Sequence, residues 1–394
     1  MSNAISRLEL RSFTQFSELD IDFAPKINII VGENGTGKTH LLKAAYALCC
    51  SGSFYESNPE TGNENLTEAM TQKLLRLFMP IGNKLANVRR RGASGEASAI
   101  VKFALDARLE ATFSSSSKSL SIDSSTLGKY LAKPIFIPTK EALSLVRGMM
   151  HPDHDQNTVE MIFDDTYVDL AKHLMRSGHG DAEHAIDLDP RFGSIIPELT
   201  DLIGGRYSWQ DGDFCFQHGR YEERANPKNS RSAHAQAYQD SVQTSFVASK
   251  EPLFSSSMTA EGFKKIGMLH RLLSNGTLAS DTSGPLFWDE PESNLNPKLM
   301  KLLVQTLLEL SRNGQQIILA THDYVLLKWF DLLTEKGKED HVRFHALYRD
   351  VQESGRIKLE STDDYRAISP NAIADTFNDL TKEQVRQKMG SLGK

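Results

Sequence analysis

Apolar and polar residues alternate through the first part of the chain, in ISRLELRSF and again in SELDIDF. A period of two places one face of a strand against a core and the other toward solvent. After Pro25 the pattern changes to the nearly continuous apolar run INIIV, which is typical of a strand buried on both faces. Residues 39–50 then have the spacing of a helix that packs on a sheet. The pattern predicts two half-buried strands, one buried strand and a helix, in that order.

Further apolar runs of strand length follow. They are PIFIP at 134–138, PLFW at 285–288, QQIILAT at 315–321, and VRFHALYRD and IKLEST near the end of the chain. The first leads into TKEALSLVRGMM, where Thr139 is a suitable N-cap for a helix. Buried strands that alternate with helices predict an α/β core with a mixed central sheet. Alternation over residues 97–123, with a serine-rich turn, adds an antiparallel β layer.

The segments between these runs are more polar. Residues 51–72 have the composition of an exposed loop, and residues 150–200 are mainly helical in pattern. Residues 203–217 predict a hairpin that turns at Asp211-Gly212, and residues 219–250 predict an extended or mobile insertion. We expect an N-terminal lobe at 1–145, a compact, mostly helical insertion at 146–250, and a C-terminal lobe at 251–394.

The composition, 39% hydrophobic and 24% charged over 394 residues, is that of a globular protein. The formal net charge of −6 argues against a generally basic surface for nucleic acid. The three cysteines form neither a disulfide framework nor a Cys-x-x-Cys metal motif. Since no run of eighteen apolar residues occurs, we expect a cytoplasmic protein without a membrane partner.

The segment INIIVGENGTGKTH contains the pattern G-x-x-x-x-G-K-[ST] between a strand and a helix. Its glycines let successive N–H groups face one concavity, and the helix N-terminus adds partial positive charge. Lys38 can reach the β- and γ-phosphates, and the Thr39 hydroxyl can bind Mg²⁺. We expect this P-loop to bind a nucleotide through Gly32, Asn34, Gly35, Thr36, Gly37, Lys38 and Thr39.

A second group of polar residues follows the strand at 285–288. Asp289 ends the strand and can hold Mg²⁺ through water. Glu290 can orient or deprotonate the attacking water. His322 follows the strand at 315–321, and ligands of open α/β sheets bind at such carboxyl ends. We therefore expect His322 to contact the γ-phosphate or the water, and name Glu290, His322 and Lys38 as catalytic.

Other candidates are weaker. His151, His154, His179 and His184 lie in polar, turn-rich surroundings without a ligand spacing, so we reject a metal site there. The triple arginine at 89–91 is better explained as a solvated turn than as a phosphate contact. Lys140 and Glu141 remain open between first-turn surface charge and a role near the nucleotide.

The P-loop, the distant WDEPESNLNP and the run ATHD together resemble ABC-type ATPases of the SMC and RecF kind, and within these the compact prokaryotic AAA-annotated ATPases of phage-defence operons. The resemblance covers residues 1–50, 130–145 and 255–325. It implies ATP and Mg²⁺ as cofactors and a homodimer, or a higher homo-oligomer, in which two protomers sandwich each nucleotide. A compact insertion stands where SMC proteins carry long coiled coils.

The same resemblance implies residues that act across the dimer. The signature loop matches residues 258–265, with Ala260, Glu261 and Gly262 at its centre, although Ala260 replaces the usual serine. The D-loop matches residues 293–297, with Asn296 where many relatives carry Asp or His. The Q-loop position falls at residues 139–141 but lacks the glutamine, and the sequence leaves its replacement open.

The favoured function is an ATP-hydrolysing switch that controls a separate effector, such as a nuclease from the same operon, as in Septu-like defence systems. Only about seventy residues follow His322, fewer than a typical fused effector domain has. The trigger is left open between DNA and a phage-derived molecule. The alternative is a RecF- or SMC-like repair ATPase that binds DNA directly. A transporter subunit and a small-molecule kinase fit less well.

Overall fold

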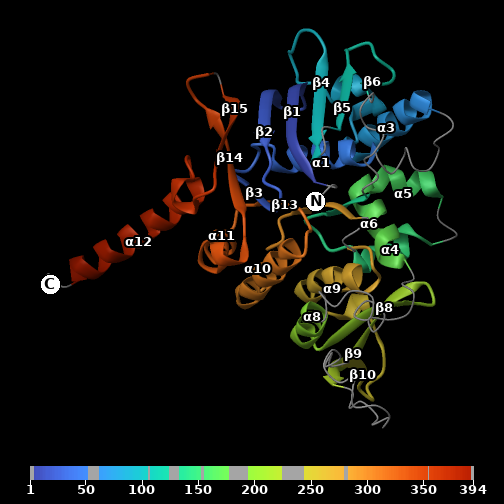
Figure 1. Ribbon diagram of the computed structural model, residues 1–394, viewed down its shortest axis with the longest axis vertical. Helices are drawn as coiled ribbons and strands as arrows, with labels where there is room; N and C mark the ends of the chain where they lie inside the picture. Colours follow the sequence, from blue (N-terminus) through green and yellow to red (C-terminus); the bar gives the residue numbers. More distant parts are fainter. Residues whose placement is uncertain are drawn as a thin grey trace, which may run out of the picture. The chain divides into compact units, whose positions relative to one another are not determined.

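The computed structural model (Figure 1) describes residues 4–51, 62–104, 107–123, 133–151, 155–176, 194–223, 244–278, 283–353 and 355–391. The chain divides into two compact units. The first contains residues 1–140, 156–170 and 280–394, and the second contains residues 141–155 and 171–279. Each unit is described by itself.

The first unit is built on a six-stranded sheet with the order β15-β14-β3-β13-β12-β7. Five of its strands are parallel, and β15 pairs antiparallel with β14 at one edge. The buried strands are the continuous apolar runs, because both sheet faces are covered. The mixed central sheet is therefore confirmed. Its strands are β3 (Ile27–Gly32), β7 (Lys133–Ile137), β12 (Ser283–Asp289), β13 (Ile317–Thr321), β14 (Val342–Asp350) and β15 (Arg356–Thr362).

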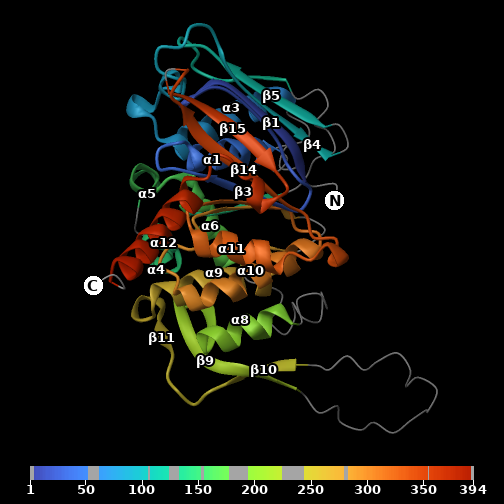
Figure 2. The same ribbon diagram turned by 90° about the vertical axis from the view of Figure 1, so that its left-hand side faces the viewer.

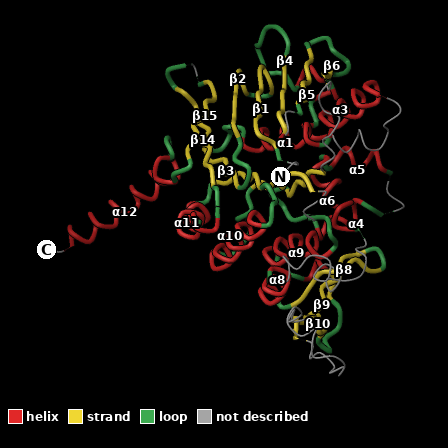
Figure 3. The backbone as a smooth tube through the Cα atoms, in the orientation of Figure 1, coloured by secondary structure: helices red, strands yellow, loops and turns green. Residues whose placement is uncertain are grey.

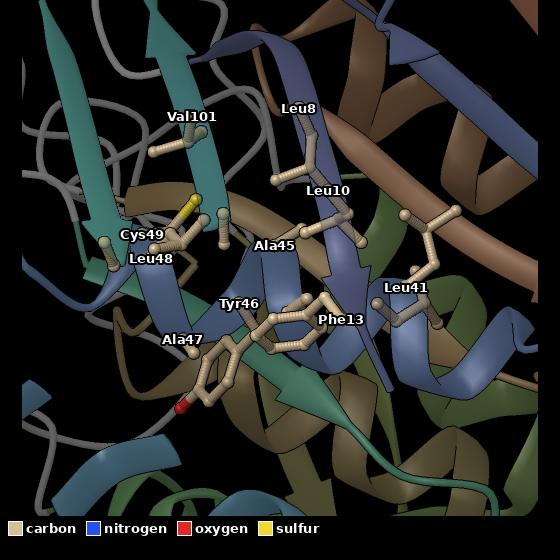
Figure 4. Packing of buried hydrophobic residues seen from close by; sticks show 14 of the residues in the cluster. Leu8, Leu10, Phe13, Leu41, Ala45, Tyr46, Ala47, Leu48, Cys49 and Val101 are labelled. Carbon is tan, nitrogen blue, oxygen red and sulfur yellow. The ribbon is translucent and has the colours of Figure 1, made fainter. Parts of the chain in front are cut away.

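The predicted antiparallel layer is also present, as a five-stranded sheet with the order β2-β1-β4-β5-β6 (Figure 3). Alternate residues of β4 and β5 are buried, as the period-two pattern predicts. Buried residues of α1 (Lys38–Cys49) join one hydrophobic cluster with this sheet (Figure 4). The helix that carries the P-loop is thus held in the core. The strands are β1 (Ile5–Phe13), β2 (Phe16–Asp22), β4 (Ala97–Phe103), β5 (Arg108–Phe113) and β6 (Ser121–Asp123).

Helix α3 (Gly62–Phe78) corrects the expectation of a loop over residues 51–72, of which 52–61 lie outside the described residues. The first residues of this helix are polar, so the sequence pattern indicated a loop instead of a helix. Tertiary contacts stabilise it, because Lys73 pairs with Asp165 at 2.8 Å and also with Asp169. Both aspartates lie on α6 (Asp165–Met175). The Tyr46 hydroxyl of α1 donates to Asp169 Oδ2 at 2.6 Å, so this ionic cluster joins α1, α3 and α6.

The other helices of the first unit are α5 (Gln156–Ile162), α10 (Pro297–Arg312), α11 (Tyr324–Leu333) and α12 (Ala372–Ser391). At residues 89–91, the Arg89 guanidinium donates to the carbonyls of Ala93 and Gly95. This arginine therefore closes a turn, as the favoured interpretation expects. Among the described residues, no helix has the length and apolar character needed to span a bilayer.

The second unit combines helices with a small antiparallel sheet. The predicted hairpin is confirmed, since β8 (Gly205–Gln210) and β9 (Asp213–Glu223) flank Asp211-Gly212. Residues 219–250 were expected to be an extended or mobile insertion, and at its two ends β10 (Thr244–Ala248) pairs with the far part of β9 (Figure 2). Residues 224–243 lie outside the described part. The other elements are α4 (Leu143–Met149), α8 (Ile195–Ile203), β11 (Phe254–Ser255) and α9 (Glu261–Ser274).

Candidate active site

The P-loop joins the end of β3 to the start of α1, and two of its glycines lie against other backbone or side chains. A Cβ on Gly32 would lie 2.4 Å from the Leu347 carbonyl oxygen of β14. Gly37 has φ 99°, and a Cβ there would lie 2.0 Å from Gln15 Nε2. Both positions therefore require glycine. Gly37 precedes α1 and gives it no side-chain cap, so the first N–H groups of the helix face the loop.

Lys38 is buried and folds back over the loop. Its Nζ donates to the carbonyls of Gly32 at 2.7 Å and Glu33 at 3.2 Å. Burial lowers the pKa of Lys38, while the nearby carboxylates of Glu290, Asp289 and Glu292 act in the opposite direction. The three carboxylates of the WDEPE segment thus act electrostatically on this ammonium group. Of the other loop residues, Thr36 is buried and its hydroxyl donates to the Glu33 carbonyl at 2.8 Å, whereas Asn34 and Gly35 are exposed.

Asp289 receives two hydroxyl hydrogen bonds at one oxygen. Thr39 donates to Oδ2 at 2.8 Å, and Thr139 donates to the same oxygen at 3.0 Å. The other oxygen, Oδ1, is buried and has no hydrogen-bond partner. Burial raises the pKa of Asp289, so the carboxylate gains from a nearby positive charge. An all-oxygen set with one unsatisfied carboxylate oxygen fits Mg²⁺. The residues present are thus suited to hold this cation.

Thr139 does not cap a helix, which corrects the sequence prediction. It follows β7, and α4 begins only at Leu143 after Ala142. Its hydroxyl is instead the second hydroxyl, after that of Thr39, that donates to Asp289 Oδ2. Thr139 is thus the residue at the expected Q-loop position that contacts Asp289. Glu141 belongs to the second unit, where Oε2 accepts from the Ser144 N–H at 3.1 Å and Oε1 lies 3.6 Å from Lys264 Nζ; Lys140 is exposed.

Glu290 and His322 form a pair at the ends of adjacent strands. His322 Nδ1 lies 3.2 Å from Glu290 Oε1. Glu290 has φ 49°, a left-handed backbone conformation that is uncommon outside glycine. Its N–H donates to the Ala320 carbonyl at 2.9 Å, and its Oε2 accepts from the Ser293 hydroxyl at 3.2 Å. These two hydrogen bonds hold the strained turn at Glu290 in place. The side chains of Glu290 and His322 are both partly exposed. A carboxylate beside an imidazole can accept a proton from water.

Glu292 is a site residue that the sequence analysis missed. It is 7% exposed, and its Oε1 accepts from the Thr321 hydroxyl at 2.7 Å and from the His322 N–H at 3.2 Å. Its Oε2 is buried without a hydrogen-bond partner, and burial raises the pKa of Glu292. The only sequence signal was a third acidic residue in WDEPE. Glu292 fixes the backbone that carries His322.

Two substitutions of Glu292 distinguish the effect of its hydrogen bonds from the effect of its charge. Glu292→Gln keeps an acceptor for Thr321 and His322, so we expect near-normal stability and ATP hydrolysis. Glu292→Ala leaves the buried Thr321 hydroxyl and the His322 N–H unsatisfied, which costs about 1–3 kcal/mol each. We expect a lower melting temperature and a lower hydrolysis rate for the alanine variant. Thermal unfolding and phosphate release measure these effects, and equal behaviour of the two variants would contradict the assignment.

The signature-loop residues lie in the second unit. Ala260 precedes α9, and Glu261 and Gly262 are in its first turn, so residues 261–265 of the expected signature loop are already helical. Ala260, Glu261 and Phe263 are exposed, and Met258 is 75% exposed. Asn296, the D-loop residue, caps α10, and its Oδ1 accepts from the Lys298 N–H at 3.0 Å. The nucleotide contacts of Ala260, Glu261, Gly262 and Asn296 stay predictions.

Two family models match the chain. A model described as an AAA domain matches residues 7–158, which include the P-loop. A second, described as "AAA domain, putative AbiEii toxin, Type IV TA system", matches residues 218–328, which include Asp289, Glu290 and His322. The matched segments thus contain both halves of the site described above. Both matches are to AAA domains, and each covers less than half of the chain.

Individual relatives match only short segments of the chain. The DNA replication and repair protein RecF of Halalkalibacterium halodurans is 45% identical over 49 residues, 12% of this chain and 13% of the relative. RecF of Bacillus mycoides is 30% identical over 90 residues, 23% of this chain and 21% of the relative. The chain thus matches less than a quarter of the length of either relative.

Solved SMC heads match more of the chain, but weakly. The SmcHead bound to the C-winged helix domain of ScpA is 13% identical with a TM-score of 0.48, covering 91% of this chain and 97% of the other. The SMC head domain from Thermotoga maritima is 12% identical with a TM-score of 0.43, covering 91% and 99%. These TM-scores are too low to assign a shared fold by likeness alone.

Proposed function

We propose that the chain binds Mg²⁺-ATP and hydrolyses it to ADP and phosphate, and that ATP joins two copies of the chain. The observation that carries the proposal is the convergence of Thr39, Thr139 and the half-satisfied Asp289 beside the Glu290–His322 pair. The P-loop supplies backbone N–H groups and Lys38 for the phosphates. The experiment is phosphate release from ATP by the purified chain, with and without Mg²⁺.

Different residues of the chain have different roles in hydrolysis. The loop N–H groups and Lys38 bind the β- and γ-phosphates and offset their charge. Thr39 and Asp289 would hold Mg²⁺, which when bound neutralises charge that develops on the phosphate oxygens. Glu290 takes a proton from the water that attacks the γ-phosphorus as the bond to the ADP oxygen breaks. His322, 3.2 Å from Glu290, orients this carboxylate and the water.

Thr139 should act through its hydroxyl. Thr139→Val removes the hydrogen bond to Asp289 Oδ2 but keeps the side-chain shape. We expect the Mg²⁺ concentration for half-maximal hydrolysis to rise several-fold, because the carboxylate loses a group that orients it. Thr139→Ser keeps the hydroxyl and should restore the wild-type value. A Mg²⁺ titration of ATP hydrolysis measures both, and a valine variant with an unchanged titration would show that the hydroxyl has no role.

The dimer is proposed from the signature loop. Each nucleotide would lie between the P-loop of one protomer and residues 260–262 of its partner. Gly262, in the first turn of α9, allows close approach of backbone N–H groups to a phosphate. Exposed Met258 and Phe263 flank this loop and would be covered in the dimer. Light scattering during gel filtration, with ATP and with ADP, tests whether the dimer depends on the γ-phosphate.

We further propose that the dimer controls a separate effector, a nuclease encoded in the same operon, in antiviral defence. The description of the model matching residues 218–328 supports this setting, since it names a toxin of a Type IV TA system. The test is co-purification with the product of the neighbouring gene, followed by nuclease assays of each protein and of the complex. Cleavage of nucleic acid by the ATPase alone would reject a separate effector.

Direct DNA binding is the second candidate, since the short RecF matches are to proteins named for DNA replication and repair. It predicts an affinity for DNA that falls steeply with salt and rises with ATP. Titrations of duplex and single-stranded DNA at two salt concentrations distinguish it from the effector model. Equal, negligible binding under all conditions would remove this candidate.

A further inference from the structure

Arg349 reaches the P-loop from a strand far away in the sequence. It lies near the end of β14, and its Nη2 donates to the Gly35 carbonyl at 2.6 Å. Leu347, two residues earlier, belongs to the hydrophobic cluster that contains α1. Because residues two apart on a strand share a face, Arg349 lies on the α1 face of the sheet. The close approach of the Leu347 carbonyl to Gly32 places this strand end beside the loop.

The sheet order shows which part of a nucleotide would meet Arg349. Strand β3 lies between β13 and β14. Asp289, Glu290 and His322 follow β12 and β13, on one side of β3, which the proposed function assigns to the γ-phosphate. Arg349 is on β14, on the opposite side. A phosphate chain that ends near Glu290 therefore has its ribose end toward Arg349.

The charge of Arg349 is not neutralised by a carboxylate of the described residues, unlike that of its neighbours. Arg343, on the same strand, pairs with Asp363 at 2.7 Å. Arg356, on β15, pairs with Glu353 at 3.8 Å. The exposed Arg349 guanidinium uses one of its N–H donors for the hydrogen bond to the Gly35 carbonyl. A guanidinium has five donors, which suit two oxygens of one phosphate.

We propose that Arg349 binds the α-phosphate of the nucleotide held by the P-loop. The inference rests on the proposed function, because it assigns a further binding residue to the same site. Lys38 and Arg349 then hold the phosphate chain from two sides, with Lys38 near the carboxylates and Arg349 near the ribose. The competing explanation is that Arg349 only braces the loop through the Gly35 carbonyl.

Three substitutions separate the two roles. Arg349→Ala removes both charge and donor, Arg349→Gln keeps a donor for Gly35 without the charge, and Arg349→Lys keeps the charge. For a phosphate contact, we expect the alanine and glutamine variants to bind ADP about tenfold more weakly, and the lysine variant to bind at an intermediate level. The affinity of both neutral variants should also depend less on salt. Calorimetry with ADP measures these values.

Inorganic tripolyphosphate provides the second probe, because it has neither base nor ribose. The loss seen with ADP should recur with tripolyphosphate. A loss confined to ADP would place Arg349 on the base or ribose and overturn the proposal. Recovery of ADP binding by Arg349→Gln would also overturn it, in favour of bracing.

Arg356→Ala is the matched control, since Arg356 lies on the adjacent strand and pairs with Glu353 away from the loop. It should bind ADP like the wild type. Thermal unfolding checks that each variant is folded. If Arg349→Ala has a lowered melting temperature, the glutamine and lysine variants alone are used to test the proposal. If the wild type binds no nucleotide, the proposed function fails. If it binds ADP and all Arg349 variants bind equally well, only the Arg349 assignment fails.

Discussion

Glu290→Gln is expected to lower ATP hydrolysis by on the order of 10²–10⁴-fold at saturating ATP while leaving ATP binding intact. The amide has the shape of the carboxylate and keeps an acceptor for Ser293, but it cannot take a proton from water. Because ATP then persists, the variant should accumulate as an ATP-bound dimer. Phosphate release measures the first effect, and gel filtration with light scattering measures the second.

The control for this experiment is Glu335→Gln, which neutralises an exposed carboxylate that pairs with Lys338. It should hydrolyse ATP at the wild-type rate. Normal turnover by Glu290→Gln would show that another group activates the water. If Glu290→Gln hydrolyses ATP slowly but does not accumulate as a dimer, Glu290 is still the base that activates the water. In that case ATP binding does not drive dimer formation.

Lys38→Ala is expected to weaken ATP binding by on the order of 100-fold or more, because it removes the buried cation that would pair with the β- and γ-phosphates. It also leaves three carboxylates close together without their ammonium neighbour. Mg²⁺-ATP should therefore bind poorly, and both hydrolysis and dimer formation should be lost. Calorimetric titration with ATP gives the affinity directly.

Lys382→Ala, on the exposed face of α12, is the matched lysine control and should bind ATP like the wild type. An Lys38→Ala chain that binds ATP normally would exclude a phosphate contact for Lys38. Comparison of its melting temperature with that of the wild type separates lost binding from lost folding.

The sequence predicted the parts of the site whose signal is local. The P-loop is defined by eight consecutive residues, and the buried strands by continuous apolar runs. Thr139 was misassigned because a threonine after a strand also has the composition of an N-cap, and only the hydrogen bond to Asp289, 150 residues away in sequence, reveals its role. Glu292 and Arg349 were missed for the same reason, since their partners depend on which strands lie side by side.

The error at residues 62–72 has a different physical origin. The segment GNENLTEAMTQ has few apolar residues, so its helical spacing is weak. The helix is stabilised by the buried pairs of Lys73 with α6 rather than by an apolar face alone. Such long-range charge pairs have no periodic signature, and composition therefore favoured a loop.

That ionic cluster also bears on how the P-loop helix moves. Tyr46 and Lys43 of α1 contact Asp169 and Asp164, which lie on α6 and just before it. The contact of Lys43 with Asp164 is a largely buried ion pair at 2.7 Å, and removing one partner of a buried ion pair typically costs about 3–5 kcal/mol. Within the first unit, the helix that follows the P-loop is therefore held against α3 and α6 by charged groups as well as by apolar contacts.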